Sequence, residues 1–390
     1  MVLLNKIKEK TKEIRPEMER LSKYIYDNPE LGNEEYLSSK AHVDLLKSRG
    51  FSVEYPYLGI DTAFKAIYKS DKPGPTIAFL SEYDALPGIG HGCGHNLLGS
   101  TTTTAGIVLK ELIDQHGGSV VVLGTPAEET NGAKVTMAES NTFNDIDIAM
   151  CTHPHDSWQA SGTSMAMEAL EFEFFGKTSH AAAAPHMGRN ALDAAVGMYI
   201  NVSMYRQQLH HSARVHGIIK DGGQAANVIP EYARNQYYIR AMTMAELTEI
   251  RTRIIDCAQA AARAANCDMK YNNYELSYHN LITNQTLSNR FNENMVDLGV
   301  YMITEERDGM GSLDMGNVSQ KVPVINPYFS MTDGQKLTGH TVDFREATMT
   351  GLAKDNAELM VQGLVYTSLQ LIDDKELLET VKREFNNTNF

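Results

Sequence analysis

The sequence predicts an α/β protein in which a smaller, ferredoxin-like (split-βαβ) domain is inserted into a larger α/β domain. Three observations predict this fold class. In the first part of the chain, short and almost wholly apolar runs alternate with helical patterns. After about residue 163 the strands carry one polar face, and near the C-terminus the first pattern returns. A chain of 390 residues is also long enough for two or three domains of ~100–200 residues each.

The chain begins with two helices and continues with strands. Leu21 and Ile25 share one helix face, as do Leu37, Ala41 and Leu45. The apolar runs expected to form strands lie at residues 62–68, 76–80, 119–124 and 146–151. A helix is expected at about 97–114, between the second and third of these runs. Because the strands are almost wholly apolar, we expect both faces of their sheet to be covered.

The middle part of the chain has the order β-α-β-β-α-β. Residues 170–174 alternate apolar and acidic side chains, as in a strand with one solvated face. Thr243 and Glu246 have the spacing of a capping box and predict the start of the second helix. The remaining elements are a helix at about 188–208, strands at 213–220 and 233–241, and a last strand at 268–276. This order is that of a split-βαβ domain.

The pattern of the larger domain resumes near the C-terminus. A helix near 285–300, an apolar strand at 322–326 and a long helix from about 351 repeat the earlier alternation. The expected boundaries are 1–165 and 279–390 for the larger domain and 166–278 for the inserted one.

The composition excludes several classes of protein. Hydrophobic residues make up 42% and charged residues 22% of the chain, which excludes a disordered or fibrous protein. The 35 basic and 49 acidic side chains give a net charge of −14, which argues against binding to nucleic acid or anionic membranes. The sequence has neither a signal-peptide pattern nor the ~18 consecutive apolar residues of a membrane span. Four cysteines make no disulfide scaffold, and we expect a protein of the reducing cytoplasm.

Potential metal ligands follow three predicted strands. Cys93 and His95 lie in a glycine-rich turn, and thiolate and imidazole suit a zinc-like ion, although such a pair alone is more often structural. Glu128 and Glu129 follow the run at 119–124. Adjacent acidic residues are usually a solvated loop, but they could also serve as general base (Glu128) and metal ligand (Glu129). His153 follows the next strand, and the proline after it holds its backbone extended.

Together these clusters favour a metal centre. Ligand sites of α/β sheets form beyond the carboxyl ends of the strands. Ligands after three strand ends in succession are difficult to attribute to chance, and His340 near the C-terminus offers a fifth. Five ligands suffice for two ions with open positions. The sulfur, nitrogen and oxygen donors favour zinc, with manganese or cobalt as alternatives.

Nine motifs over nearly the whole chain are PELGNEE, EYDALPG, GCGHN, GTPAEE, THP, GKTSHAAAAPHMGRNALDAA, HGIIKDGGQAANVIP, GSLDMGNVS and GHTVDF. In this order they resemble the aminoacylase/carboxypeptidase family of dinuclear metallopeptidases. The match is closest to its amidohydrolase branch of hippurate, indole-acetyl-amino-acid, aminobenzoyl-glutamate and β-alanyl-dipeptide hydrolases. The resemblance implies an α/β/α metallopeptidase catalytic domain, with the inserted domain as a lid and dimerisation domain, and therefore a homodimer.

The resemblance also implies roles for individual residues. The implied ligands of two divalent metal ions are Cys93, which bridges them, His95, Glu129, His153 and His340, with Glu128 as general base. His180 is similar to a lid histidine that reaches the neighbouring subunit's active site and stabilises the oxyanion. Asn227 and Arg240 are similar to lid residues that bind the substrate carboxylate, which a guanidinium can pair bidentately. Asp84 would orient a ligand histidine rather than bind metal.

Two positions depart from the family pattern. Asn96 stands where many relatives have Asp after the Cys-Gly-His run, as on the aminobenzoyl-glutamate and β-alanyl-dipeptide hydrolase side. This leaves open whether a carboxylate supports the ligands there. Glu82 stands where the wider peptidase family has a metal-binding histidine, an arrangement that Cys93 and His95 replace.

The implied reaction is hydrolysis of an amide or peptide bond to a C-terminal amino acid, in a dipeptide, an aryl-amide or an N-acyl amino acid. An aminoacylase for simple N-acyl amino acids is the first alternative, which the motifs do not separate from a dipeptidase. An inactive, metal-stabilised binding protein on the same fold is the second, against which the intact pair Glu128-Glu129 argues. A redox or structural thiol protein is disfavoured because no two cysteines have CxxC spacing.

Overall fold

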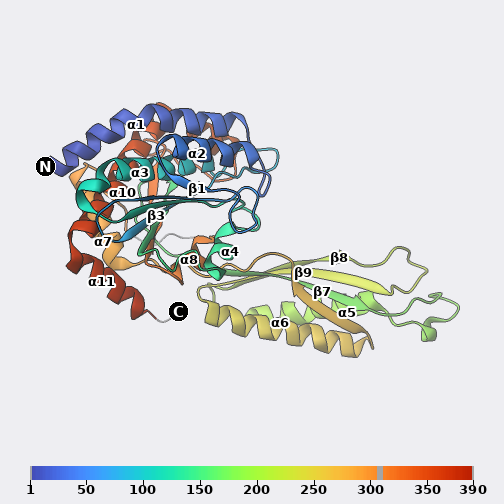
Figure 1. Cartoon of the computed structure of the whole chain (residues 1–390). Coiled ribbons are helices and arrows are strands. Elements are labelled where there is room, and N and C mark those ends of the chain that lie inside the picture. The colour runs from blue at the N-terminus through green and yellow to red at the C-terminus, as the bar shows by residue number, and fades with distance from the viewer. Residues whose placement is uncertain (1, 305–310, 389–390) are drawn as a thin grey trace. The chain divides into compact units, whose positions relative to one another are not determined.

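The computed structural model describes residues 2–304 and 311–388 and confirms the expected fold class. The chain forms two compact units. The second unit contains residues 164–280 and 311–313. The first unit contains all other described residues. The first unit carries a mixed sheet and the second a separate antiparallel sheet (Figure 1). No helix in the described ranges has the length and apolar character needed to cross a membrane.

A six-stranded mixed sheet lies at the centre of the first unit. Its strands, in spatial order, are β1 (Ser52–Glu54), β2 (Phe64–Lys69), β4 (Ser119–Gly124), β3 (Thr76–Ser81), β5 (Ile148–Met150) and β11 (Val324–Ile325). β4, β3, β5 and β11 are parallel, whereas β2 is antiparallel to both β1 and β4. Each of the four predicted apolar runs therefore overlaps a strand, with ends that agree to within two residues. A second, two-stranded parallel sheet consists of β6 (His153–His155) and β12 (Tyr328–Ser330).

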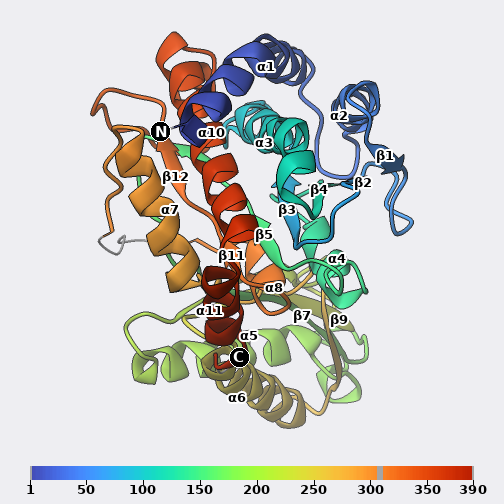
Figure 2. The same cartoon turned by 60° about the vertical axis from the view of Figure 1, so that its left-hand side comes forward.

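The helices of the first unit pack around α3 (His95–His116), which is buried over most of its length. α1 (Val2–Asp27) and α10 (Gly351–Asp373) contact α3 and each other, and Figure 2 shows the three side by side. The other helices are α2 (Tyr36–Ser48), α4 (Ala133–Glu139), α7 (Gln285–Asp297), α8 (Met315–Ser319), α9 (Val342–Ala347) and α11 (Lys375–Asn386). The long last helix expected from residue 351 is divided at Asp374, because this residue has extended backbone and its side chain caps α11.

Two glycines allow close approaches at the ends of the parallel strands. Gly99 lets α3 pass so near the end of β3 that a Cβ there would lie 2.2 Å from the carbonyl oxygen of Glu82. Gly94 has φ +82° at the start of α3, and a Cβ there would lie 2.5 Å from Pro154 on β6. The chain segments that follow β3 and β5 are therefore held together.

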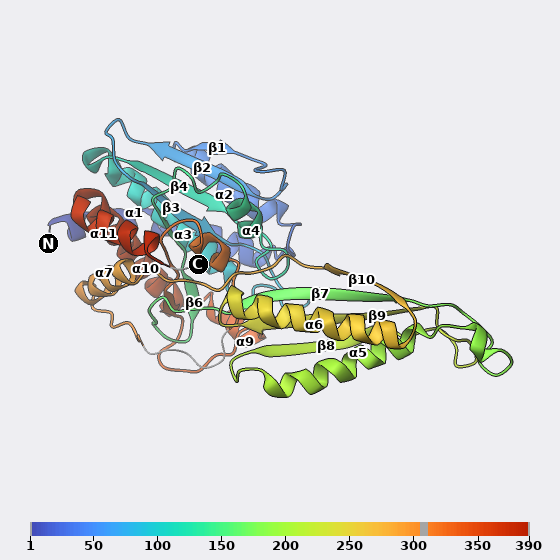
Figure 3. The same ribbon diagram turned by 90° about the horizontal axis from the view of Figure 1, so that it is seen from below.

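The second unit is a four-stranded antiparallel sheet with two helices. Its strands, in spatial order, are β10 (Asp268–Asn273), β7 (Ala166–Phe175), β9 (Tyr232–Ala241) and β8 (Arg214–Asp221). Its helices are α5 (Ala191–Tyr205) and α6 (Met244–Ala264), with 3-10 turns at Pro185–Met187 and Arg206–Gln208. α5 and α6 lie side by side (Figure 3) and share a core with the sheet. The expected order is confirmed, and Thr243 caps α6 by accepting a hydrogen bond from the backbone N of Glu246 at 3.2 Å.

His42 is a buried polar residue in the core of the first unit. It lies on α2, and its Nδ1 is 2.8 Å from Oγ1 of Thr103 on α3. Its ring centre lies 5.9 Å from that of Phe64 and 5.2 Å from that of Tyr83. Burial lowers the pKa of His42 to about 3, because the charged ring would lose its hydration.

We expect the substitution His42→Asn to make folding less sensitive to acid. The pKa of His42 is about 3 in the folded chain and 6.5 ordinarily, so the unfolded chain binds the proton more tightly. The stability contributed by the neutral ring is therefore present above pH 6.5 and is lost as the pH falls toward 3, by about 1.4 kcal/mol per pH unit. Urea denaturation from about pH 7 to about pH 4.5 should show a shallower loss in the variant.

Asn is a suitable replacement because its amide can still reach Thr103. The exposed His186→Asn is the matched control and should follow the wild type. Equal pH slopes for wild type and His42→Asn would contradict a buried neutral imidazole.

Candidate metal centre

The potential ligands lie beyond the carboxyl ends of the parallel strands. Cys93 lies in the turn that follows β3, and His95 is the first residue of α3. Glu129 follows β4, and His153 begins β6 shortly after β5. Because β4, β3 and β5 are neighbours in the sheet, their carboxyl ends meet at one edge.

His340 reaches this edge from the C-terminal part of the chain. Its backbone N–H donates a hydrogen bond to the carbonyl oxygen of Gly92 at 2.9 Å, beside the Cys93 turn. Its φ of +63° is uncommon for a residue other than glycine. The next residue, Thr341, caps α9. The backbone on both sides of His340 is thus fixed next to the turn.

The ligand atoms form two groups that share Cys93. Those of Cys93, His95 and His153 lie within 4.8 Å of one another, and so do those of Cys93, Glu129 and His340. The structure thus brings all five sequence-predicted ligand residues together, with the thiol common to both groups. Two ions bridged by one ligand would require two such groups of ligand atoms with one atom in common.

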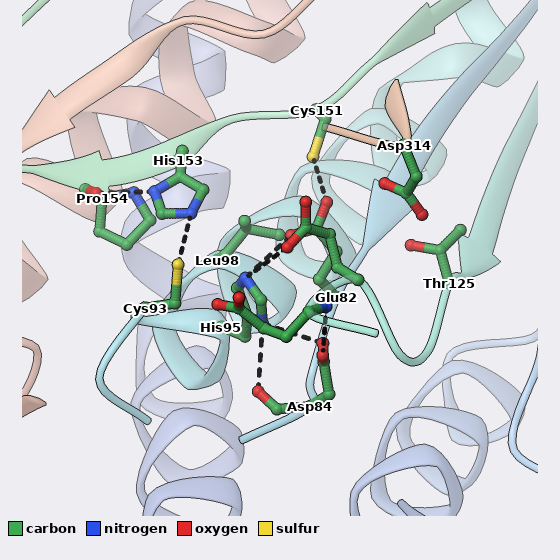
Figure 4. A network of polar contacts seen from close by, with 12 residues as sticks. Glu82, Asp84, Cys93, His95, Leu98, Thr125, Cys151, His153, Pro154 and Asp314 are labelled. Atoms are coloured by element: carbon green, nitrogen blue, oxygen red, sulfur yellow. Dashed lines mark hydrogen bonds and ion pairs between the residues drawn. The ribbon is translucent and has the colours of Figure 1, made fainter. Parts of the chain in front are cut away.

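The separations between ligand atoms fit the size of a metal ion. Tetrahedral coordination with bonds of about 2.0–2.3 Å places neighbouring ligand atoms about 3.3–3.6 Å apart. Sγ of Cys93 lies 3.5 Å from Nε2 of His153 (Figure 4), and Nε2 of His340 lies 3.4 Å from Oε1 of Glu129. Nε2 of His95 is buried and forms no hydrogen bond with any residue that the structure describes. The donor set and its spacing therefore fit divalent ions.

His95 and His153 both direct Nε2 toward this space. Nδ1 of His95 lies 3.1 Å from the carbonyl oxygen and 2.9 Å from carboxylate Oδ1 of Asp84. Nδ1 of His153 lies 2.8 Å from the carbonyl oxygen of Pro154. When Nδ1–H donates to these oxygens, the Nε2 lone pair is left for an ion. The other oxygen of Asp84 accepts a hydrogen bond from the backbone N of Glu129 at 3.0 Å, so Asp84 links two ligand residues.

The surroundings favour a positive charge. Burial lowers the pKa of His95, but Asp84 and Cys93 outweigh burial and raise this pKa well above its ordinary value. Burial, together with the charge of His95, lowers the pKa of His153 to about 4. Burial and then Glu129 raise the pKa of the Cys93 thiol, whereas coordination to a metal ion deprotonates a thiol outright.

Glu128 lies beside these ligands. Its Oε2 is 4.0 Å from Nε2 of His95, and the residue is 7% exposed. Glu128, His95 and Glu82 form a third group of potential ligand atoms within 4.8 Å of one another. Burial, followed by the carboxylates of Glu82 and Asp314, raises the pKa of Glu128 well above its ordinary value. A carboxylate in such surroundings can accept a proton and return it.

Sequence reasoning missed two charged residues of this region, Lys134 and Asp314. Lys134 lies on α4 and is fully buried, with Nζ 2.8 Å from Oε1 of Glu82 and 2.6 Å from Oδ1 of Asp314. Asp314 precedes α8, which contacts α4. Asp314 belongs to the motif GSLDMGNVS, but no local pattern pairs it with a lysine 180 residues away.

Asn96, one of the two departures from the family pattern, contributes to the packing of the first unit. Its side chain is buried, and its Nδ2 donates hydrogen bonds to Oγ of Ser22 and Oγ1 of Thr348, both at 3.2 Å. Asn96 therefore ties the start of α3 to α1 and to the residue after α9.

The inserted domain carries three of the predicted site residues, His180, Asn227 and Arg240, and they lie at two different ends of its sheet. His180 and Asn227 are exposed and near each other, since the N–H of Ala181 donates to the carbonyl oxygen of Asn227 at 3.0 Å. Asn227 precedes β9, whereas Arg240 is next to the last residue of this ten-residue strand. Nη1 of Arg240 donates a hydrogen bond to Oγ of Ser312 at 2.7 Å. At ~3.3 Å per residue, about 30 Å separates the two ends of β9.

Known proteins are similar to this chain in both sequence and domain content. Residues 167–266 match the family model of the peptidase dimerisation domain. The chain is 37% identical to an Xaa-Arg dipeptidase from Mus musculus over 404 aligned residues, covering 98% of this chain and 92% of that protein. It is 36% identical to an Xaa-Arg dipeptidase from Homo sapiens over 384 residues, covering 94% of this chain and 88% of that protein.

Solved structures share the fold. An aminobenzoyl-glutamate utilization protein from Klebsiella pneumoniae has a TM-score of 0.71 at 19% identity, covering 93% of this chain and 97% of that chain. A dinuclear metal binding peptidase of the M20 family from Bacillus subtilis has a TM-score of 0.66 at 19% identity, covering 90% and 98%. The identity of 37% to the dipeptidase extends over nearly the whole chain. The chain therefore belongs to the M20 peptidase family of metal-dependent hydrolases.

Proposed function

We propose that this M20 metallohydrolase is a dipeptidase, which hydrolyses the peptide bond of a dipeptide and releases the C-terminal amino acid. The 37% identity to an Xaa-Arg dipeptidase over 98% of the chain carries this proposal. Dipeptides with a C-terminal arginine are therefore the first substrates to test. The net charge of −14 supports the approach of such a cationic substrate.

Five residues hold the metal ions in the proposed centre. They are Cys93, His95, Glu129, His153 and His340, whose ligand atoms converge in two groups. The chemistry that divalent ions would supply there is polarisation of the scissile carbonyl and a lower pKa of the attacking water. One thiolate and three imidazoles favour zinc, with manganese and cobalt as alternatives. A thiolate ligand requires reduced cysteine, and all four cysteines are free thiols, which supports a reducing compartment such as the cytoplasm.

Glu128 is the general base of the proposed mechanism. Its carboxylate lies 4.0 Å from Nε2 of His95, beside the ligands but outside the proposed set of five. An oxygen of Glu128 accepts a proton from the attacking water as the new C–O bond forms. Glu128 then donates this proton to the nitrogen of the leaving amine as the C–N bond breaks, so that the carboxylate is regenerated.

Residues of the second unit complete the site in this proposal. Arg240 pairs with the free carboxylate of the substrate, Asn227 donates an amide hydrogen bond to the substrate, and His180 stabilises the oxyanion. β9 separates Arg240 from the other two by about 30 Å, more than the length of a dipeptide. One substrate cannot contact both ends of the sheet of one chain. We therefore propose that His180 and Asn227 act in the site of a second subunit.

The homodimer is proposed to form through β8 and α5. β8 is an edge strand of its sheet and contacts α5. These two elements carry a group of exposed apolar side chains, which we call the α5–β8 patch. The patch consists of Val196, Tyr199, Ile200, Met204, Ile218 and Ile219. An exposed edge strand beside apolar side chains favours pairing with another chain, and the matched peptidase dimerisation domain includes both elements.

Two other functions would use the same fold. An aminoacylase would need the same metal ligands and would differ in the pocket for the acyl group. An inactive binding protein would have no need of a buried carboxylate at Glu128, beside the ligand Glu129. The identity to a dipeptidase favours the dipeptidase over both.

The first prediction from the proposed function concerns both the substrate and the general base. After removal of metal and separate addition of zinc, manganese or cobalt, the protein should release arginine or lysine from Xaa-Arg and Xaa-Lys dipeptides. Glu128→Gln should lower turnover by at least ~10²-fold, because the amide has similar size but cannot accept the proton. Its metal content, measured by plasma mass spectrometry, should equal that of the wild type.

The same panel includes N-acetyl amino acids, hippurate and aminobenzoyl-glutamate. Cleavage of N-acyl amino acids alone would favour the aminoacylase, and failure on every amide would favour the binding protein. Turnover near the wild-type level in Glu128→Gln would remove this residue from the mechanism.

A second prediction concerns the α5–β8 patch. Ile200→Asp places a charge among exposed apolar side chains, and we expect it to convert the dimer to a monomer in light scattering. The control is Val296→Asp on α7 of the first unit, where the side chain is 46% exposed and lies outside the patch. A dimer that persists in Ile200→Asp would show that this patch is not the interface.

A third prediction tests whether subunits complete each other's sites. Glu128→Gln and His180→Ala homodimers should each be nearly inactive. Mixing, unfolding and refolding the two variants should produce hybrids with one site that has both Glu128 and the partner's intact His180. Activity should therefore return to a substantial fraction of the wild type. A mixture as inactive as its two components would place His180 in the site of its own chain.

A further inference from the structure

Glu82 is a buried carboxylate that the mechanism above does not use. It follows β3 and is 4% exposed. Its Oε1 lies 2.8 Å from Nζ of Lys134. Its Oε2 lies 3.2 Å from Nε2 of His95, and Figure 4 shows these two side chains together. Oε2 is buried and forms no hydrogen bond with any residue in the described parts of the chain. The two oxygens therefore have different surroundings.

The gap between Glu82 and His95 has the properties of a cation position. Asp84 engages Nδ1 of His95, so Nε2 is the ring atom that faces Oε2 of Glu82, and it becomes a donor atom for a metal ion once its proton is displaced. A buried imidazole nitrogen and a carboxylate oxygen at this distance need a positive charge between them, either a proton on Nε2 or a metal ion that replaces this proton. Their separation of 3.2 Å is close to the ~3.3 Å between neighbouring oxygen and nitrogen ligands of one tetrahedral ion.

Lys134 fixes the direction in which the carboxylate of Glu82 points. Its buried ammonium lies between Oε1 of Glu82 and Oδ1 of Asp314, at 2.8 and 2.6 Å. Rotation of Glu82 away from Lys134 would leave a buried charge without this partner, which is costly. Oε1 is thus engaged by Lys134, and Oε2 remains for an ion. Carboxylate ligands are commonly oriented by such a hydrogen bond from outside the coordination sphere.

We propose that Glu82 is a fourth protein ligand of the ion held by Cys93, His95 and His153. This inference rests on the proposed dinuclear centre. The first ion then has one sulfur, two nitrogen and one oxygen donor from the protein. The second ion has three protein donors, from Cys93, Glu129 and His340, and keeps a position for water or substrate.

The side chains around the two proposed ions also differ in their exposure to solvent. The side chains of His95 and Glu82 are 0% and 5% exposed, whereas that of His340 is 55% exposed. The first ion is therefore the more tightly held, and the second is the one that exchanges readily.

Titration of the metal-free, full-length protein with cobalt(II) tests the proposal without reference to turnover. In Glu82→Gln, the amide oxygen is needed as acceptor for Lys134, so the NH₂ group faces the ion and cannot ligate. Loss of one hydrogen-bond partner of a ligand typically weakens metal binding 10–100-fold, so loss of a ligand should weaken binding of the first cobalt at least about 100-fold. The d–d bands of the first cobalt should shift, and the thiolate band from Cys93 should remain.

Two results would overturn the proposal. One is unchanged affinity for the first cobalt in Glu82→Gln. The other is weaker binding with unchanged d–d bands, which would show an unaltered coordination sphere and restrict Glu82 to positioning His95. The matched control is Glu168→Gln, a buried carboxylate of the second unit that lies 2.9 Å from Nε of Arg251, and it should bind cobalt as the wild type does.

Folding of the variants is checked by circular dichroism. If Glu82→Gln does not fold, Glu82→Leu is the second variant, because it has no ligating atom and leaves the buried pair of Lys134 and Asp314 intact, and the same titration and criteria apply. Two bound ions without dipeptidase activity would reject the proposed substrate and leave the inference intact. Failure of the wild type to bind two ions would reject the dinuclear centre and the inference together.

Discussion

The candidate metal centre depends on the close approach of one glycine turn to β6. A side chain at Gly94 would come within 2.5 Å of this strand, and its absence lets Sγ of Cys93 lie 3.5 Å from Nε2 of His153. The same turn accepts a hydrogen bond from the backbone of His340 through the carbonyl oxygen of Gly92. One short turn thus brings a thiol between ligands from segments that are distant in the sequence. The carboxylates that follow β3 and β4 join them because these strands end at the same edge of the sheet.

Buried negative charge around this turn explains why the site should bind cations. Glu82, Asp84, Glu128 and Asp314 are all buried, and Lys134 is the one buried lysine among the residues that the structure describes. Burying several carboxylates around a single ammonium is costly unless further positive charge is present. Two divalent ions would supply that charge, so metal binding and the order of this sheet edge are expected to be linked. The excess of acidic residues in the whole chain is thus also present locally, as buried carboxylates at this site.

The convergence of the candidate ligand residues could be predicted from the sequence, whereas much of their surroundings could not. Cys93 and Glu129 follow apolar runs that were recognisable as strands, and strand ends of one sheet converge. Lys134 was not predicted, because a lysine on a short helix has the pattern of a solvated residue until its burial is known. The position of Arg240 relative to His180 depends on the length of β9 and on its pairing with β7, and motif order alone does not contain that information. The division of the last helix at Asp374 was missed because the helical pattern continues on both sides of it.

In the proposed centre, one thiolate, that of Cys93, binds two metal ions. Anomalous diffraction at the zinc edge, from crystals of the zinc-loaded protein, tests this arrangement. We expect two anomalous peaks about 3.5–4 Å apart, both at bonding distance from Sγ of Cys93, about 2.3 Å. A single peak, or two peaks of which only one contacts Cys93, would contradict it.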